Sequence, residues 1–220
     1  MILTLDPKLL DIVGRSFQVT LTALAISIVI GLPIGVWLAL ANFPGKRVVT
    51  AIIYTGMGLP PVVVGLLVYL LLSRSGVFGS LRWLFTLQAM MIAQIILATP
   101  VIIGISLSSI LGVDAELRLQ LRALGATRLQ AIRGLLWEAR FGLIVGLVAG
   151  FGSIISEVGA VMLVGGNIDG RTRVMTTAIV LETQQGHFDI ALGLGIVLLA
   201  ISFVTNFLLV LLQGDTRRKL

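Results

Sequence analysis

Apolar residues occupy most of this chain in long runs that are separated by short polar stretches. Five runs are long enough to cross a hydrocarbon core of about 30 Å at a helical rise of about 1.5 Å per residue. They cover approximately residues 17–41, 49–72, 84–111, 141–164 and 188–212. The pattern predicts an all-α integral membrane protein with five transmembrane helices in a single transmembrane domain, 1–220.

Two of the five runs carry small residues at every fourth position, which places them on one face of a helix. These residues are Gly31, Gly35 and Ala39 in the first run and Gly142, Gly146 and Gly150 in the fourth. Such faces allow helix backbones to approach closely. We expect the first face to pack within one subunit, with a contact between two copies as the alternative, and the face in the fourth run to be the stronger close-packing face.

Prolines and one carboxylate are the unusual features inside the runs. Pro60 and Pro61 must interrupt the helical hydrogen bonds of the second run, and Pro100 lies within the third. These three prolines are candidate elements of a pathway or gate, and passive kinks are the alternative. Apart from Asp189 at the very start of the last run, Glu157 is the only acidic residue in the five runs, and we expect it to brace the helices or to take part in a gate.

The longest polar interruption, residues 113–140, predicts two short amphipathic helices around a glycine turn. Asp114 is placed to cap the first helix, whose apolar stripe is Leu117, Leu121 and Leu124. Gly125 provides the turn, because glycine adopts a positive φ without strain.

Thr127, followed three residues later by Gln130, has the form of a capping box that opens the second helix. The apolar face of that helix is Leu129, Ile132 and Leu136. The protrusion formed by the two helices fits a groove on a soluble partner, and a basic loop lying on lipid headgroups is the alternative.

The residues around Gly125 carry a resemblance to a known family. The run Ala123-Leu124-Gly125-Ala126-Thr127-Arg128, with Leu135 ten residues beyond the glycine, is similar to the cytoplasmic loop of ABC importer permease subunits. The chain departs from that pattern in having Leu119-Gln120-Leu121 in place of Glu-Ala-Ala and Trp137-Glu138 in place of Leu-Pro. A second stretch, residues 155–183, resembles the corresponding part of tungstate importer permeases.

The resemblance implies a type I ABC importer permease fold with a cytoplasmic coupling loop between the third and fourth spans. The residues that it assigns to contact with the ATPase are Leu121, Arg122, Leu124, Gly125, Ala126, Thr127 and Arg128. It also implies a homodimer that works with two ABC ATPase subunits and an extracytoplasmic substrate-binding protein, with ATP and Mg bound by the ATPase. The implied cargo is an oxyanion, tungstate first and molybdate or sulfate as alternatives, so direct contact of the cargo with Glu157 would be repulsive.

The positions of the basic residues predict the orientation of the chain. Six of its sixteen Lys and Arg precede the first span or lie in the links after the second and fourth, and the other ten lie in the alternate segments. The positive-inside rule then places the N-terminus outside and the C-terminus and coupling loop inside a cytoplasmic membrane. On the outer side, the densest polar cluster is a candidate docking surface for the binding protein: Asn167, Asp169, Arg171 and Arg173.

The composition of the chain excludes several classes of function. The chain is 57% hydrophobic and 12% charged, with a mean hydropathy of +1.09, so its net charge of +6 reflects basic span ends in contact with lipid rather than nucleic-acid binding. It contains no Cys, one His, no phosphate-binding loop and no hydrolase motif. We therefore expect no cofactor and no catalysis by this chain alone. The alternative to a permease is a membrane anchor that recruits a soluble protein through the same loop.

Overall fold

The computed structural model describes residues 7–214, apart from the side chains of Arg118, Arg122, Leu209, Val210 and residues 212–214. Within this part the chain is helical and has no strand. The elements are α1 (Pro7–Leu40), α2 (Lys46–Met57), α3 (Pro61–Leu72), the short 3-10 helix η2 (Gly79–Leu81), α4 (Leu87–Leu111), α5 (Ala115–Ala123), α6 (Arg128–Ile155), α7 (Gly159–Gly165), α8 (Met175–Gln184) and α9 (Phe188–Gly214).

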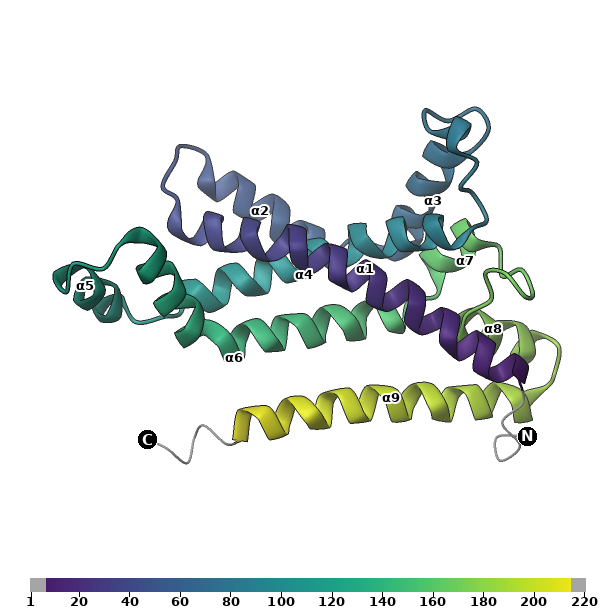
Figure 1. Ribbon diagram of the computed structural model, residues 1–220. Helices are drawn as coiled ribbons and strands as arrows, with labels where there is room; N and C mark the ends of the chain where they lie inside the picture. The colour runs from purple at the N-terminus through teal and green to yellow at the C-terminus, as the bar shows by residue number, and fades with distance from the viewer. Residues whose placement is uncertain (1–6, 215–220) are drawn as a thin grey trace.

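Four long helices lie along one bundle, with α4 at its centre (Figure 1). In the described residues, α1, α4, α6 and α9 are each long and apolar enough to cross a membrane, and α2 with α3 makes a fifth span if the bent pair is counted as one. Helices α1, α2, α3, α6 and α7 all pack against α4. The exposed apolar side chains of the outer helices suit a lipid environment, as expected for a multi-pass membrane protein.

The two small-residue faces pack inside the subunit, which confirms the preferred interpretation of their spacing. A Cβ on Gly35 would lie 2.8 Å from the Cβ of Ser106, so α1 crosses α4 with almost no side chain between them. A Cβ on Gly146 would lie 2.9 Å from the Cγ2 of Ile105, so α6 crosses the same helix equally closely. Both faces therefore position α4 rather than a second copy of the chain.

The second predicted span is broken where the sequence indicated. Helix α2 ends at Met57, Pro60 has an extended backbone, and Pro61 occupies the first turn of α3. The two helices differ in direction by 98°. As a result α3 leaves the line of the bundle, as Figure 1 shows, and packs against α7.

The fourth predicted span, 141–164, requires correction. Helix α6 runs without interruption from Arg128 to Ile155, so it joins the second helix of the polar loop to most of the span. The chain then breaks at residues 156–158 before the short helix α7. Polar side chains such as Arg133 and Glu138 leave the backbone hydrogen bonds of a helix intact, so a change in polarity did not mark a helix boundary.

The other span limits shift by less. Helix α1 begins at Pro7, ten residues before the apolar run, because proline suits a first helical turn and the residues that follow it pack on the bundle. Helix α4 begins at Leu87, and α9 extends to Gly214. The apolar segment 174–181 lies mainly in α8, whose first residues are buried and which packs against α1 and α9.

Candidate coupling turn and gate

The turn between α5 and α6 is an exposed protrusion at one end of the bundle (Figure 1). Gly125 has a φ of +73°, which confirms the predicted left-handed turn, and a Cβ at this position would have no atom within 4 Å. The turn therefore requires a left-handed backbone conformation that favours glycine, and it is open on its outer side. A flat partner surface can approach the backbone of Gly125 directly.

Side-chain caps hold both helices that flank this turn. Thr127 Oγ1 accepts a hydrogen bond from the N–H of Gln130, and Gln130 Oε1 accepts one of 2.8 Å from the N–H of Thr127. This confirms the predicted capping box. At the start of α5, Asp114 Oδ1 accepts a bond of 2.9 Å from the N–H of Glu116, as the sequence also indicated. The protrusion is thus a defined structure rather than a loose loop.

The predicted apolar stripe of α5 divides into a packed part and an exposed part. Leu121 lies against α6, since a Cβ on Gly134 would be 3.2 Å from its Cδ1, and Leu117 packs on the cluster that contains Leu135. Leu124, however, is 83% exposed and does not belong to the packed stripe. The position next to a turn carries it past the end of the helix, so its spacing no longer sets its direction.

Exposed leucines surround the turn. Leu119 and Leu129 are 65% and 59% exposed, and with Leu124 they make apolar side chains available at this end of the molecule. Leu119 was not among the candidate contact residues, although its position away from the apolar stripe of Leu117 and Leu121 was a usable signal. Arg128 is exposed, Ala126 is half-buried, and the side chain of Arg122 lies outside the described residues. Apolar side chains on a charged loop suit docking to a protein better than solvation alone.

A cavity of about 560 Å³ lies behind the protrusion, where the end of α4 faces α5 and the start of α6. Its lining includes Asp114 and Glu138, so its charged groups are acidic. Nearby, the guanidinium of Arg140 lies 4.5 Å from the ring centre of Trp137, which is exposed, and 4.4 Å from that of Phe141. Such an aromatic and basic group is typical of a membrane interface.

Glu157 lies in the break between α6 and α7 and not within a continuous helix as expected. Its Oε1 accepts a hydrogen bond of 3.0 Å from the N–H of Ala160, so the carboxylate caps the first turn of α7. Its carbonyl oxygen accepts a bond of 2.9 Å from Thr176 Oγ1 of α8. These contacts are those of a brace, which is one of the two roles, bracing or gating, that the sequence suggested.

The two broken spans meet at the contact between α3 and α7. A Cβ on Gly159 would lie 2.7 Å from the Cγ2 of Val62, the residue after Pro61. The structure therefore brings Pro61 and Glu157 to the same helix contact. Pro100 contacts the other arm of the bent pair, because a Cβ on Gly56 would lie 3.0 Å from its Cβ. Helix α4 itself continues through Pro100 without a break.

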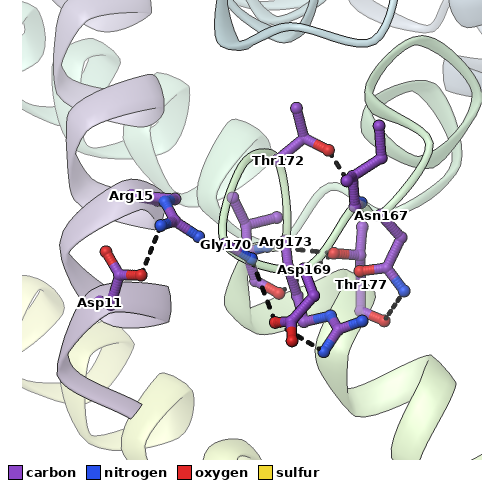
Figure 2. A network of polar contacts seen from close by, with 10 residues as sticks. Asp11, Arg15, Asn167, Asp169, Gly170, Thr172, Arg173 and Thr177 are labelled. Carbon is purple, nitrogen blue, oxygen red and sulfur yellow. Dashed lines mark hydrogen bonds and ion pairs between the residues drawn. The ribbon is translucent and has the colours of Figure 1, made fainter. Parts of the chain in front are cut away.

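The four candidate docking residues divide into two kinds (Figure 2). Arg173 is turned into the loop, where its Nη1 donates a bond of 3.0 Å to Asp169 Oδ1 and its side chain is 18% exposed. Asn167, with a φ of +50°, donates from Nδ2 to the carbonyl oxygen of Thr177 at 3.3 Å. Asp169 and Arg171 are exposed. Asn167 and Arg173 thus shape the loop, Asp169 does so too while staying exposed, and Arg171 is available to a partner.

The coupling turn and this polar loop lie at opposite ends of the molecule. Figure 1 shows α5 and the end of α9 at one end of the bundle, and the start of α1 with the α7–α8 loop at the other. A membrane around the bundle would therefore separate Gly125 from Arg171. The two candidate contact surfaces are thus separated by the length of the bundle.

Comparisons with known proteins agree with this geometry. Residues 31–218 match the family described as "binding-protein-dependent transport system inner membrane component". A probable anion ABC transporter permease protein of Haloferax volcanii is 43% identical over 91% of this chain and 88% of its own length. A tungstate uptake system permease protein of Peptoclostridium acidaminophilum is 39% identical over 98% of this chain and 94% of its own length. A molybdenum transport system permease protein of Escherichia coli is more distant, at 28% identity over 85% of each chain.

Solved structures agree on the fold. The inward-facing methionine ABC transporter has a chain with a TM-score of 0.73 at 23% identity, covering 92% of this chain and 93% of that one. A bacterial alginate ABC transporter, solved with its periplasmic protein, has a TM-score of 0.73 over 94% of this chain and 78% of that one. These likenesses show the fold of a type I ABC importer permease. The chain therefore belongs to the family of inner membrane components of binding-protein-dependent transport systems, the transmembrane permease subunits of ABC importers.

Proposed function

We propose that this chain is the permease of an oxyanion importer whose first cargo is tungstate. The observation that carries the proposal is the similarity over almost the whole chain to a tungstate uptake permease, together with an exposed, doubly capped turn suited to an ATPase. Molybdate and sulfate are the alternative cargoes, since permeases for both are related at lower identity. A second relative named as a tungstate permease, from Campylobacter jejuni, supports tungstate as the first cargo, ahead of molybdate and sulfate.

In this proposal the chain works as a homodimer with two ABC ATPase subunits. ATP and Mg are bound and used by the ATPase, and this chain binds no cofactor. Closure of the ATPase dimer displaces the turn at Gly125, and the displacement passes along α6 to the breaks near Glu157 and Pro61. The helices then alternate between outward-open and inward-open arrangements. Pro60, Pro61, Pro100 and Glu157 belong to the gate, and Asp169 and Arg171 contact the binding protein.

The proposed orientation places the N-terminus outside and the C-terminus inside the cytoplasmic membrane. The positive-inside rule supports it, and Figure 1 shows the α5–α6 turn and the α7–α8 loop at opposite ends of the bundle, as the proposal requires. Because the chain has no native Cys, Arg128→Cys and Arg171→Cys are clean probes. In sealed cells a membrane-impermeant maleimide should label position 171 and not position 128. Labelling of position 128 from outside would reverse the orientation.

Uptake by reconstituted vesicles tests the cargo. With the cognate ATPase and binding protein, wild-type permease should import tungstate only when ATP is present, and excess molybdate or sulfate should compete less effectively than unlabelled tungstate. An equal or stronger effect of molybdate would assign that anion instead. If ATP drives no uptake although the ATPase binds, the chain is an anchor and not a permease. Crosslinking of single-Cys variants in the same vesicles should detect a pair of permease chains.

A further inference from the structure

A buried amide of the central helix contacts the break between α6 and α7. Gln94 of α4 is 4% exposed, and its Nε2 donates a hydrogen bond of 2.9 Å to the carbonyl oxygen of Ile154. Ile154 is the penultimate residue of α6. Because the helix ends there, its last carbonyl groups lose the regular partners that a longer helix would provide. The amide of Gln94 thus supplies a donor at the point where the chain stops being helical.

A second side chain donates a hydrogen bond to a backbone carbonyl group on the other side of the break. Thr176 of α8 is 5% exposed, and its Oγ1 donates to the carbonyl oxygen of Glu157. The carbonyl oxygen of Ile154, which also accepts the N–H of Glu157 at 3.3 Å, and the carbonyl oxygen of Glu157 are therefore each bonded by a side chain from a different helix. Within a membrane, backbone groups that leave a helix must find partners in the protein, because lipid provides none. Side chains of α4 and α8 therefore stabilise the break, which is a defined part of the fold and not a local disruption of α6.

Helix α6 connects this break mechanically to the coupling turn. Its 28 residues correspond to a rod of roughly 42 Å at about 1.5 Å per residue. The rod begins next to Gly125 and ends at Ile155, and beyond the break α7 packs on α3. Along the backbone, a displacement of the turn reaches the contact between α7 and α3 through residues 156–158, whose geometry the bonds to the carbonyls of residues 154 and 157 help to hold.

We propose that Gln94 is a positioning residue that sets the direction of α7 relative to α6, with Thr176 as its counterpart on α8. Its role in transport rests on the proposed permease function, but its role in the break is a property of the chain alone. Gln94 keeps the break in one geometry, so that movement of α6 becomes movement of α7. Without that bond the end of α6 turns while α7 stays in place.

Spin-label distances measure the break without transport. Ser153 on α6 and Leu163 on α7 are exposed, and in a chain without native Cys their replacement by Cys gives a single labelled pair. Labelled subunits are diluted with unlabelled ones, so that only distances within a subunit are recorded. Gln94→Met keeps the length of the side chain and removes its donor. Gln88→Met is the matched control, because Gln88 lies on the same helix and is exposed.

The expected result is a broader or displaced distance distribution for Gln94→Met, with the Gln88→Met distribution equal to wild type. If Gln94→Met does not fold, Thr176→Val decides the question, because it removes the second donor with almost no change in shape. An unchanged distribution in whichever of these variants folds overturns the proposal. This readout separates a positioning role from general destabilisation, because thermal unfolding of the same samples is measured alongside it.

Measurements of transport test the role of Gln94 in function. Gln94→Met should lower ATP-driven tungstate uptake by about tenfold, as expected for a lost buried hydrogen bond, while ATPase binding and ATP hydrolysis stay at wild-type levels. Loss of hydrolysis together with uptake would mean that the residue acts on assembly, and would overturn the positioning role. If wild-type protein imports no tungstate, the proposed function fails, and the distance measurement still decides the proposal for Gln94.

Discussion

Gly65 of α3 and Ala160 of α7 bring two backbones into direct contact. A Cβ added to Gly65 would lie 2.6 Å from the Cα of Ala160. This distance is too short for any side chain to fit between the two backbones. The two helices on either side of this contact each follow a break in a span. Their crossing is therefore the point where the bent pair α2–α3 is joined to the end of α6 through α7.

We predict that Gly65→Ala lowers stability, although alanine is the better helix former. The added methyl group must push the backbones of α3 and α7 apart, at a cost of about 1–3 kcal/mol for an overpacked contact. Gly152→Ala is the control, since a Cβ there meets no atom within 4 Å and should be neutral or stabilising. Thermal unfolding in detergent compares the two, and equal melting temperatures would show that α3 and α7 separate freely.

The polar loop leads to a second prediction, which separates two arginines that sequence alone treated as equals. Arg171→Glu should weaken stimulation of the ATPase by the binding protein, with normal melting, because this side chain is exposed. Arg173→Glu should instead lower stability, because it places two carboxylates together at Asp169. The double exchange Asp169→Arg with Arg173→Glu restores opposite charges and should recover much of that loss. Unchanged stimulation in Arg171→Glu would remove this residue from the docking surface.

Much of the fold could be predicted from the sequence because it depends on interactions between residues that are close together in the chain. Long apolar runs predicted the spans, Pro60 and Pro61 predicted the bend, and Thr127 with Gln130 predicted the cap of α6. Each of these signals acts within a few residues of the structure that it determines. The spacing of Gly31 and Gly35 also sufficed, because a helical period fixes which residues share a face.

The break at residues 156–158 was not accessible in the same way. No proline or glycine lies within it, although Gly159 follows it directly, and two groups that stabilise it belong to Gln94 and Thr176, which are 60 and 19 residues away from their acceptors. Only tertiary structure brings those donors to the break. The exposure of Leu124 escaped prediction for a related reason, since helical spacing says nothing about a residue beyond the end of its helix.

Glu157 gives a third prediction. Glu157→Gln keeps an oxygen that can accept the bond from the N–H of Ala160, so it should retain stability and uptake. Glu157→Leu removes the cap of α7 and should cost about 1 kcal/mol, with a reduction in uptake. Uptake and thermal unfolding are measured for both variants. Equal loss of uptake in both, with normal melting, would replace the bracing role by a role of the charge itself.

The coupling turn gives the last prediction, in which backbone strain has to be separated from loss of a contact. Gly125→Asp forces a non-glycine residue to adopt a φ of +73°, at a cost of about 1–2 kcal/mol, and places a carboxylate on the surface that we propose faces the ATPase. The variant should insert and melt almost normally, because a Cβ here meets no atom of the protein. ATP-driven uptake should fall to background, with the ATPase either released or hydrolysing ATP without transport.

Gly186→Asp is the matched control for this variant. Gly186 has a φ of +80° and the same open surroundings, but it lies in the turn between α8 and α9, far along the chain from the coupling turn. It therefore carries the same strain and the same added charge without touching the proposed contact. If Gly125→Asp and Gly186→Asp reduce uptake equally, strain alone accounts for the effect. If Gly125→Asp supports full uptake with normal ATPase binding, the partner must contact another surface, of which the leucines at positions 119 and 129 are the next to test.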